Sequence, residues 1–181
     1  TRQAARNAIF DRALIEKYDR PGPRYTSYPT APQFHQAFAV DDYRAAAQAS
    51  NQVAQPKPLS LYIHIPFCQS LCYYCACNKI ITQKTHRAVE YLTYLKREIA
   101  MQAALFDKSR KLTQLHFGGG TPTYLTSEQL AEVMDCLHQA FNLDDSDDHE
   151  FSIEVDPRTI SRERIAELRA QGFNRLSFGV Q

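Results

Sequence analysis

Residues 59–78 read LSLYIHIPFCQSLCYYCACN, and in this stretch an apolar segment runs directly into a group of cysteines. The apolar part alternates and is rich in β-branched and aromatic side chains, which predicts a strand over 59–67. Four of the chain's five cysteines follow within ten positions, with the spacing C-x-x-x-C-x-x-C-x-C. The sequence therefore places a dense set of thiols at the end of a strand.

Strand and helix patterns alternate downstream of this stretch. Strands are expected at 111–120, where the chain runs into glycines, at 151–155 and at 175–180. Helices are expected at 85–105, 127–141 and 161–172, with apolar stripes that include Val89, Leu92, Leu95 and Ile99 in the first and Leu130, Val133, Met134, Leu137 and Phe141 in the second. A capping box, Thr126 to Gln129, opens the second helix, and Gly172 ends the third. The alternation predicts an α/β fold with a parallel sheet, whose ligands bind at the carboxyl ends of the strands.

Upstream of residue 58 the pattern is different. Short helices are expected at 8–19 and 41–50, separated by the proline-rich segment RPGPRYTSYPTAPQF, which cannot form regular structure. We expect residues 1–57 to form an N-terminal extension, in which Arg24 and Tyr25 belong to a lid-like segment. Residues 58–181 then form the α/β part.

Composition narrows the function classes. The 181 residues are 44% hydrophobic with a net charge of +1, so there is no electrostatic case for nucleic acid or for an anionic membrane. No apolar run is long enough to span a bilayer, and the first twenty residues lack an apolar signal core. An odd number of bunched cysteines favours a reducing compartment, the cytoplasm, and metal chemistry over disulfides.

Several readings of the cysteines compete. Zinc sites commonly pair one C-x-x-C unit with a second, which is missing here. A redox C-x-x-C would explain Cys72 and Cys75 but not Cys68 and Cys77. Three thiolates on a short loop suit an iron–sulfur cluster. Cys136, within the apolar stripe of 127–141, is expected to pack in the core.

The C-x-x-x-C-x-x-C spacing resembles the signature of the radical S-adenosylmethionine superfamily. The additional Cys77 and the segments GPRYTSYPTA, LYIHIPFC, HFGGGTPTYL, SIEVDPR and GFNRLSFGVQ resemble the oxygen-independent coproporphyrinogen III oxidases. This match covers nearly the whole chain in order. The related haem-chaperone-like branch has HIPFC and GGGTP but lacks PRYTSYPT and the additional cysteine, and it is the alternative. A structural zinc-binding domain is the second alternative.

The resemblance implies a partial (β/α) barrel, of which this chain supplies the first three and a half βα units. It implies that a 5′-deoxyadenosyl radical starts the oxidative decarboxylation of two propionates of coproporphyrinogen III to vinyl groups, giving protoporphyrinogen IX. The implied cofactors are a 4Fe-4S cluster and two S-adenosylmethionine molecules. The implied partners are the porphyrinogen substrate and an electron donor such as a flavodoxin-type reductant, and the whole protein is expected to be a monomer.

The resemblance also assigns residues. It implies that the cluster is bound by Cys68, Cys72 and Cys75. It places Tyr62 and Gly119 at the first S-adenosylmethionine, Tyr74, Gly120, Thr121 and Gln181 at the second, and Glu154 on the cofactor. Cys77 is a catalytic candidate without an assigned role. His64 and His116 are more often structural in such strands, and Asp156 is expected to cap the turn before Pro157.

The sequence ends on a strand pattern, so we expect the chain to be the N-terminal piece of a longer protein and inactive alone. We also expect the apolar residues of the four strands to lose the residues that would close over them. They are Ile63, Ile65, Leu115, Ile153, Val155, Leu176 and Phe178.

Overall fold

The computed structural model describes residues 10–19, 30–73, 75–84 and 86–179, and the chain divides into two compact units, residues 1–40 and 41–181. In the first unit, helix α1 (Arg12–Tyr18) begins where the Asp11 carboxylate accepts a hydrogen bond from Leu14 N. A short 3-10 helix, η1 (Ala31–Gln33), follows. Arg24 and Tyr25 lie outside the described residues, and the domain boundary expected at 57/58 stays a prediction.

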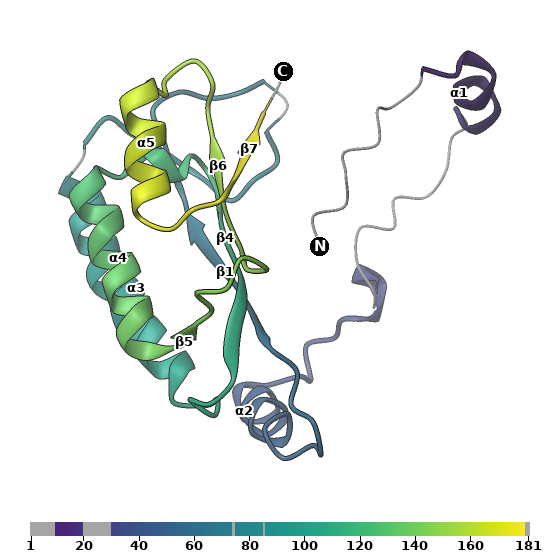
Figure 1. Ribbon diagram of the computed structural model, residues 1–181, viewed down its shortest axis with the longest axis vertical. Helices are drawn as coiled ribbons and strands as arrows, with labels where there is room; N and C mark the ends of the chain where they lie inside the picture. The colour runs from purple at the N-terminus through teal and green to yellow at the C-terminus, as the bar shows by residue number, and fades with distance from the viewer. Residues whose placement is uncertain (1–9, 20–29, 74, 85, 180–181) are drawn as a thin grey trace. The chain divides into compact units, whose positions relative to one another are not determined.

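The second unit is built on a parallel sheet with the strand order β1-β4-β6-β7 (Figure 1). Its strands are β1 (Leu59–Ile65), β4 (Lys111–Gly119), β6 (Glu150–Val155) and β7 (Arg175–Phe178), and β5 (Asn142–Leu143) pairs with the start of β4. Helices α3 (His86–Ala103), α4 (Ser127–Ala140) and α5 (Arg162–Ala170) connect successive strands of this order. The alternation expected from the sequence is confirmed, and it is that of the first units of a (β/α) barrel.

The first strand is shorter than expected because the chain changes partner at Pro66. Strand β1 pairs with β4 as far as Ile65, and the chain then forms β2 (Phe67–Cys68), which pairs with β3 (Ile80–Ile81) in a separate two-stranded sheet. Proline has no N–H to donate to a sheet, so it marks a natural break between two strands. Strands β2 and β3 thus bracket the cysteine loop, residues 69–79.

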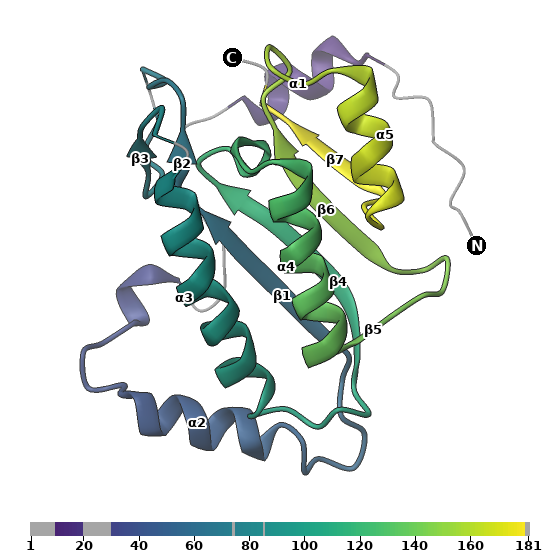
Figure 2. The ribbon, with the colours of Figure 1, turned by 90° about the vertical axis from the view of Figure 1, so that its left-hand side faces the viewer.

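Helices α3, α4 and α5 cover one face of the main sheet (Figures 1 and 2). The side chains of Ile63, Ile65, Leu115, Ile153 and Val155 point to this face and are buried in the core. The expectation that they would lose their cover is therefore wrong, because the helices of this chain provide it. Leu176 is only partly buried, and Phe178, near the end of the described residues, is 46% exposed.

The helices follow their sequence signals with small differences. The capping box of α4 is present, and Leu130, Val133, Met134 and Leu137 are buried. Phe141 is the C-cap of α4 and only half-buried. In α3 the stripe is shifted, since Ala88 is buried in the place expected for Val89, which is 58% exposed. Helix α2 (Val40–Ala49) confirms the helix expected upstream.

The other face of the main sheet is polar. It carries Ser60, Tyr62, His64, Gln114, His116, Ser152, Glu154 and Ser177 at alternating strand positions. This face is not covered by the three long helices. No helix of the described residues is long and apolar enough to cross a membrane.

Candidate functional site

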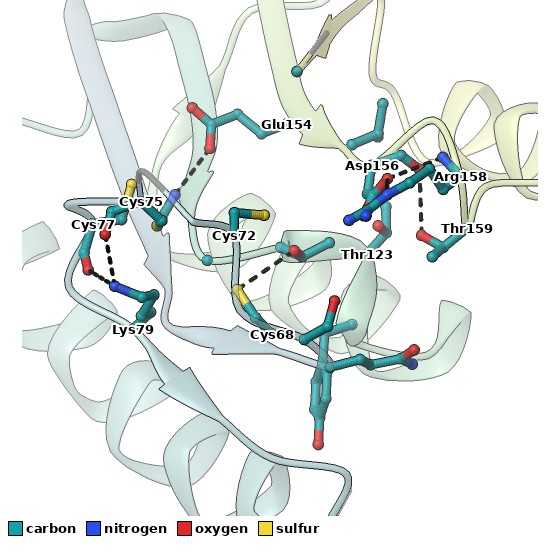
Figure 3. A pocket seen from close by; sticks show the side chains of 18 of the residues that line it. Cys68, Cys72, Cys75, Cys77, Lys79, Thr123, Glu154, Asp156, Arg158 and Thr159 are labelled. Carbon is teal, nitrogen blue, oxygen red and sulfur yellow. Dashed lines mark hydrogen bonds and ion pairs between the residues drawn. The ribbon is translucent and has the colours of Figure 1, made fainter. Parts of the chain in front are cut away.

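A cavity of about 690 Å³ lies at the carboxyl ends of the parallel strands (Figure 3). Three groups of residues line it: the cysteine loop, the glycine segment after β4, and the ends of β6 and β7. Parallel α/β folds bind their ligands at this end of the sheet. The sequence motifs that stood out therefore meet at one place.

The cysteine loop is anchored by the two residues that precede it, Phe67 and Cys68. Phe67 is buried between the rings of Tyr91 and Tyr124, at centroid distances of 5.5 and 5.3 Å. This contact places Cys68, which is buried on β2, at the wall of the cavity. A ladder bond from Thr82 N to Cys68 O, 3.0 Å long, holds the other end of the loop.

Within the loop the bonds are local. Cys75 N donates to Cys72 O at 3.1 Å and closes a turn. The ammonium group of Lys79 donates to Cys75 O at 3.0 Å and to Cys77 O at 3.4 Å (Figure 3). One cation thus ties together the carbonyl groups of two cysteines.

The thiols of Cys68 and of the three cysteines in the loop differ in their surroundings. Burial raises the pKa of Cys68, and the Thr121 hydroxyl at 3.6 Å from its sulfur opposes this shift. A hydrogen bond from the backbone N–H of Cys77 lowers the pKa of Cys75, and the Cys77 thiol and Lys79 add to the effect. The pKa of Cys77 is raised, chiefly by its hydrogen bond with Cys75. The Cys75 thiol is therefore more easily ionised than the thiol of Cys77, two positions further along the chain.

Glycines allow the segment after β4 to approach this loop. Gly119 has a φ of +115°, a conformation that residues with a Cβ avoid. Gly120 N donates to Ile65 O at 2.8 Å, and a Cβ on Gly120 would lie 2.7 Å from the carbonyl oxygens of Pro66 and Phe67. Only glycine fits this close backbone contact, which brings Thr121 beside Cys68.

Glu154 projects from β6 into the same cavity (Figure 3). Its Oε2 accepts a hydrogen bond from Gly119 N at 3.1 Å, and its Oε1 lies 3.4 Å from His116 Nε2. The carboxylate expected from the sequence to meet a cation or several donors thus has two donor groups beside it.

Asp156 caps the turn that follows, as expected. Its Oδ1 accepts from Arg158 N at 2.9 Å, and both carboxylate oxygens bind the Arg158 guanidinium. These bonds hold the pKa of Asp156 below its usual value. Both side chains lie at the rim of the cavity.

Tyr62 is placed differently from the other expected site residues. It does not line this cavity, and its side chain, 55% exposed, lies on the polar face of the sheet. Its hydroxyl lies 3.1 Å from His64 Nδ1, and its ring stacks on that of His116 at 5.7 Å. Through His116 it is joined to Glu154.

The two histidines are the residues that the sequence undervalued. His64 Nε2 lies 2.8 Å from Asn78 O and so links β1 to the cysteine loop. His116 links Glu154 to Ser152. The alternation of side chains along the strands could have found them. Once β1, β4 and β6 are aligned in register, His64 and His116 lie on the same face of the sheet as Tyr62 and Glu154.

Of the expected residues, the structure gathers eight around the one cavity. They are Cys68, Cys72, Cys75, Cys77, Gly119, Gly120, Thr121 and Glu154. Tyr74 and Gln181 lie outside the described residues. The individual roles assigned to all of these residues stay predictions.

The donor set of the cavity fits an iron–sulfur cluster. Thiolates are the protein ligands of such clusters, and Cys68, Cys72 and Cys75 all line this one cavity. The described residues contain no group of three or more His, Cys, Asp or Glu close enough to bind a single metal ion. A four-iron cluster is wider than one ion, so its thiolates stand further apart. Thr123, also on the cavity wall, has a buried hydroxyl without a hydrogen-bond partner among the described residues.

The family model of the radical SAM superfamily matches residues 62–181. This range contains the cysteine loop, the glycine segment and Glu154. Members of this superfamily use a 4Fe-4S cluster and S-adenosylmethionine, in agreement with the chemistry of the cavity.

Individual relatives are also similar. The chain is 51% identical to an oxygen-independent coproporphyrinogen III oxidase of Salmonella typhimurium, over 95% of this chain and 36% of that protein. It is 53% identical to a protein of the same name from Mannheimia haemolytica, over 82% of this chain and 97% of that one. A solved structure of the Escherichia coli coproporphyrinogen III oxidase, described as a radical SAM enzyme, matches with a TM-score of 0.77 and 48% identity, over 96% of this chain and 37% of that one.

The chain thus spans little more than a third of the length of the Salmonella and Escherichia relatives. Its similarity nevertheless runs through the sheet, the cysteine loop and the glycine segment alike. The chain belongs to the radical SAM superfamily and, within it, to the family of the oxygen-independent coproporphyrinogen III oxidases.

Proposed function

We propose that the intact protein carrying this chain converts two propionate side chains of coproporphyrinogen III to vinyl groups without oxygen, giving protoporphyrinogen IX. The observation that supports this most is the meeting of three cysteines, the GGGTP segment and Glu154 around one cavity. Similarity to oxidases of this name supports the choice of substrate.

Cys68, Cys72 and Cys75 would hold the 4Fe-4S cluster. When bound, the cluster and S-adenosylmethionine supply the 5′-deoxyadenosyl radical that removes a hydrogen atom from a propionate side chain. Three thiolates would hold three irons of such a cluster and would leave the fourth for the cofactor. The buried Cys68 fixes one corner of this site to β2, and Lys79 orders the loop that carries the other two.

The glycine segment and Glu154 would bind S-adenosylmethionine. Its methionine part carries an ammonium group and a sulfonium, which a carboxylate attracts. Gly119 and Glu154 are joined by a hydrogen bond and would serve one molecule, with Tyr62 nearby. Gly120 and Thr121, with Tyr74 and Gln181, would serve a second molecule. The cavity volume of about 690 Å³ is in the range of cofactor sites and leaves room for more than one ligand group.

Cys77 lines the same cavity. Its thiol is hydrogen-bonded to Cys75, and its pKa is raised. We assign it to turnover and not to the cluster. The electrons would come from a flavodoxin-type reductant. We further propose that the intact protein works in the cytoplasm as a monomer.

The test is turnover by the intact protein, prepared without oxygen and loaded with iron and sulfide. Incubated with coproporphyrinogen III, S-adenosylmethionine and a reductant, it should release 5′-deoxyadenosine and carbon dioxide and form protoporphyrinogen IX. Cys136→Ala is the matched control, because this cysteine lies on α4 away from the cavity. It should keep activity, whereas Cys72→Ala should lose it.

The same preparation separates the alternatives. Stable haem binding without carbon dioxide release would favour a haem-chaperone-like member of the superfamily. A colourless protein with stoichiometric zinc would favour a structural zinc site. Either result would refute the proposed function.

A further inference from the structure

Three side chains stand in a row across the polar face of the sheet. Tyr62 on β1 is the register partner of His116 on β4, and His116 is the register partner of Ser152 on β6. The imidazole of His116 lies between them, stacked on the Tyr62 ring at an interplanar angle of 23° and 2.6 Å from the Ser152 hydroxyl through Nδ1. The orientation of this imidazole is thus fixed from two sides.

Ser152 is the anchor of the row. It is only 4% exposed, and it is the one polar residue among the buried side chains of the described residues. Its hydroxyl lies 2.6 Å from His116 Nδ1 and 3.3 Å from Leu115 O. A buried hydroxyl is costly without a hydrogen bond, so the short contact with His116 has a physical reason.

The contacts of His116 determine where its proton is. Its Nε2 faces Glu154 Oε1, and an ionised carboxylate can only accept. Nε2 therefore carries the proton and donates. Nδ1 lies 2.6 Å from Ser152 Oγ, and that hydroxyl donates to Leu115 O at 3.3 Å. The contacts thus run from Ser152 through His116 to Glu154.

Glu154 receives two donors in different directions. Gly119 N donates to Oε2 at 3.1 Å, and His116 Nε2 lies 3.4 Å from Oε1. Together the two contacts fix the plane of the carboxylate across the carboxyl end of β4. Both Glu154 and Gly119 line the cavity.

We propose that His116 is a positioning residue, which holds the Glu154 carboxylate in the orientation that receives the cationic part of S-adenosylmethionine. This inference rests on the proposed function, in which Glu154 contacts that cofactor. His116 itself does not line the cavity and acts only through Glu154. Ser152 and Tyr62 support His116 in turn.

Two substitutions separate positioning from packing. The amide of a glutamine comes close to the place of Nε2 and can still donate to Glu154, but it loses the partner of Ser152. The amide of an asparagine comes close to the place of Nδ1 and keeps the bond with Ser152, but it no longer reaches Glu154. Neither amide carries a charge, so the two variants can be compared with each other without a difference in charge.

The experiment measures S-adenosylmethionine binding by calorimetry on the cluster-loaded intact protein. His116→Asn should weaken binding about tenfold, the effect of one lost hydrogen bond to a charged group. His116→Gln should bind within about threefold of the parent. His138→Gln, at an exposed position on α4, is the matched control and should bind like the parent. Iron content and thermal unfolding of each variant report whether its site and fold are intact.

A double variant tests the route of the effect. Because His116 acts through Glu154, adding His116→Asn to Glu154→Gln should weaken binding no further than Glu154→Gln alone. Nitrogen NMR of the His116 ring in the parent should show a proton on Nε2, the nitrogen that faces Glu154.

The outcomes are distinct. A parent that does not bind S-adenosylmethionine overturns the proposed function and this inference with it. A parent that binds, with His116→Asn equal to it, overturns the inference alone. Additive losses in the double variant, or weaker binding by His116→Gln than by His116→Asn, would show that His116 serves packing.

Discussion

The cysteine loop, residues 69–79, and the histidine network of Tyr62, His64, His116, Ser152 and Glu154 are ordered in different ways. In the loop the bonds of Cys75 and Lys79 span four residues or fewer. In the network Glu154 and Ser152 are bonded to residues 35–38 positions away, on another strand. The sheet therefore fixes the network, whereas the loop is held mainly at its two ends. Because metal binding supplies free energy for ordering its own ligands, a metal loop can be built in this local way.

The largest effect that this comparison predicts concerns the three expected cluster ligands. Cys68→Ala, Cys72→Ala and Cys75→Ala should each abolish cluster assembly in the intact protein, because two thiolates do not hold a cubane with one open iron. Iron, sulfide and visible absorption are the measurements, with Cys136→Ala as the control. Normal iron content in any of the three variants would show that this cysteine is not a ligand.

Cys77 should separate the cluster from turnover. Cys77→Ser should keep the iron and the visible absorption and lose conversion of coproporphyrinogen III. The reason is that the Cys77 thiol lines the cavity but is hydrogen-bonded to Cys75. The measurements are iron content and product formation on the same preparation. If this variant loses iron as the other three do, Cys77 is a ligand and the three-cysteine assignment is wrong.

Gly120 packs against the backbone that leads into the cysteine loop, and a methyl group there should be costly. Gly120→Ala places a Cβ 2.7 Å from two backbone oxygens and should destabilise the intact protein by about 3 kcal/mol, the upper range for overpacking. The control is Gly172→Ala, where nothing lies within 4 Å and only the φ of +99° is unfavourable, at about 1 kcal/mol. Denaturant unfolding measures both. Equal losses would mean that the backbone contact with Pro66 and Phe67 can relax.

The smallest effect should follow removal of the cluster. Amide hydrogen exchange of residues 69–79 should become about tenfold faster or more, because opening of a weakly held segment is then easier. Exchange of β4 and β6 should not change, since their bonds do not depend on the loop. Faster exchange throughout the sheet would show that the network is not independent of the metal.

The sequence predicted the fold well where the signal was local. The alternation of strands and helices, the capping box at Thr126 and the carboxyl-end position of the motifs all follow from short patterns, and they are confirmed. The break at Pro66 was missed, because the expected strand ran through it to residue 67, although proline lacks the N–H that a continuous strand needs. The shift from Val89 to Ala88 in α3 was not predictable, since neighbouring helix positions differ only in what packs against them.

The candidate site divides in the same way. The cysteines form one short segment and the glycines another, so each group could be found as a sequence motif. The link from Ser152 through His116 to Glu154 depends on the register of two strands, which spacing along the chain does not reveal. The expectation that the apolar strand residues would be uncovered was wrong for a related reason, because alternation shows that a strand has two faces but not which one the helices cover.

We propose that Cys68, Cys72 and Cys75 hold a 4Fe-4S cluster with one iron open to S-adenosylmethionine. The most direct measurement is electron paramagnetic resonance of the reduced intact protein, prepared without oxygen, before and after S-adenosylmethionine is added, with iron and sulfide measured on the same sample. We expect about four irons and four sulfides per chain and a cluster signal that changes when the cofactor binds. Stoichiometric zinc without sulfide, or a cluster signal that S-adenosylmethionine leaves unchanged, would contradict it.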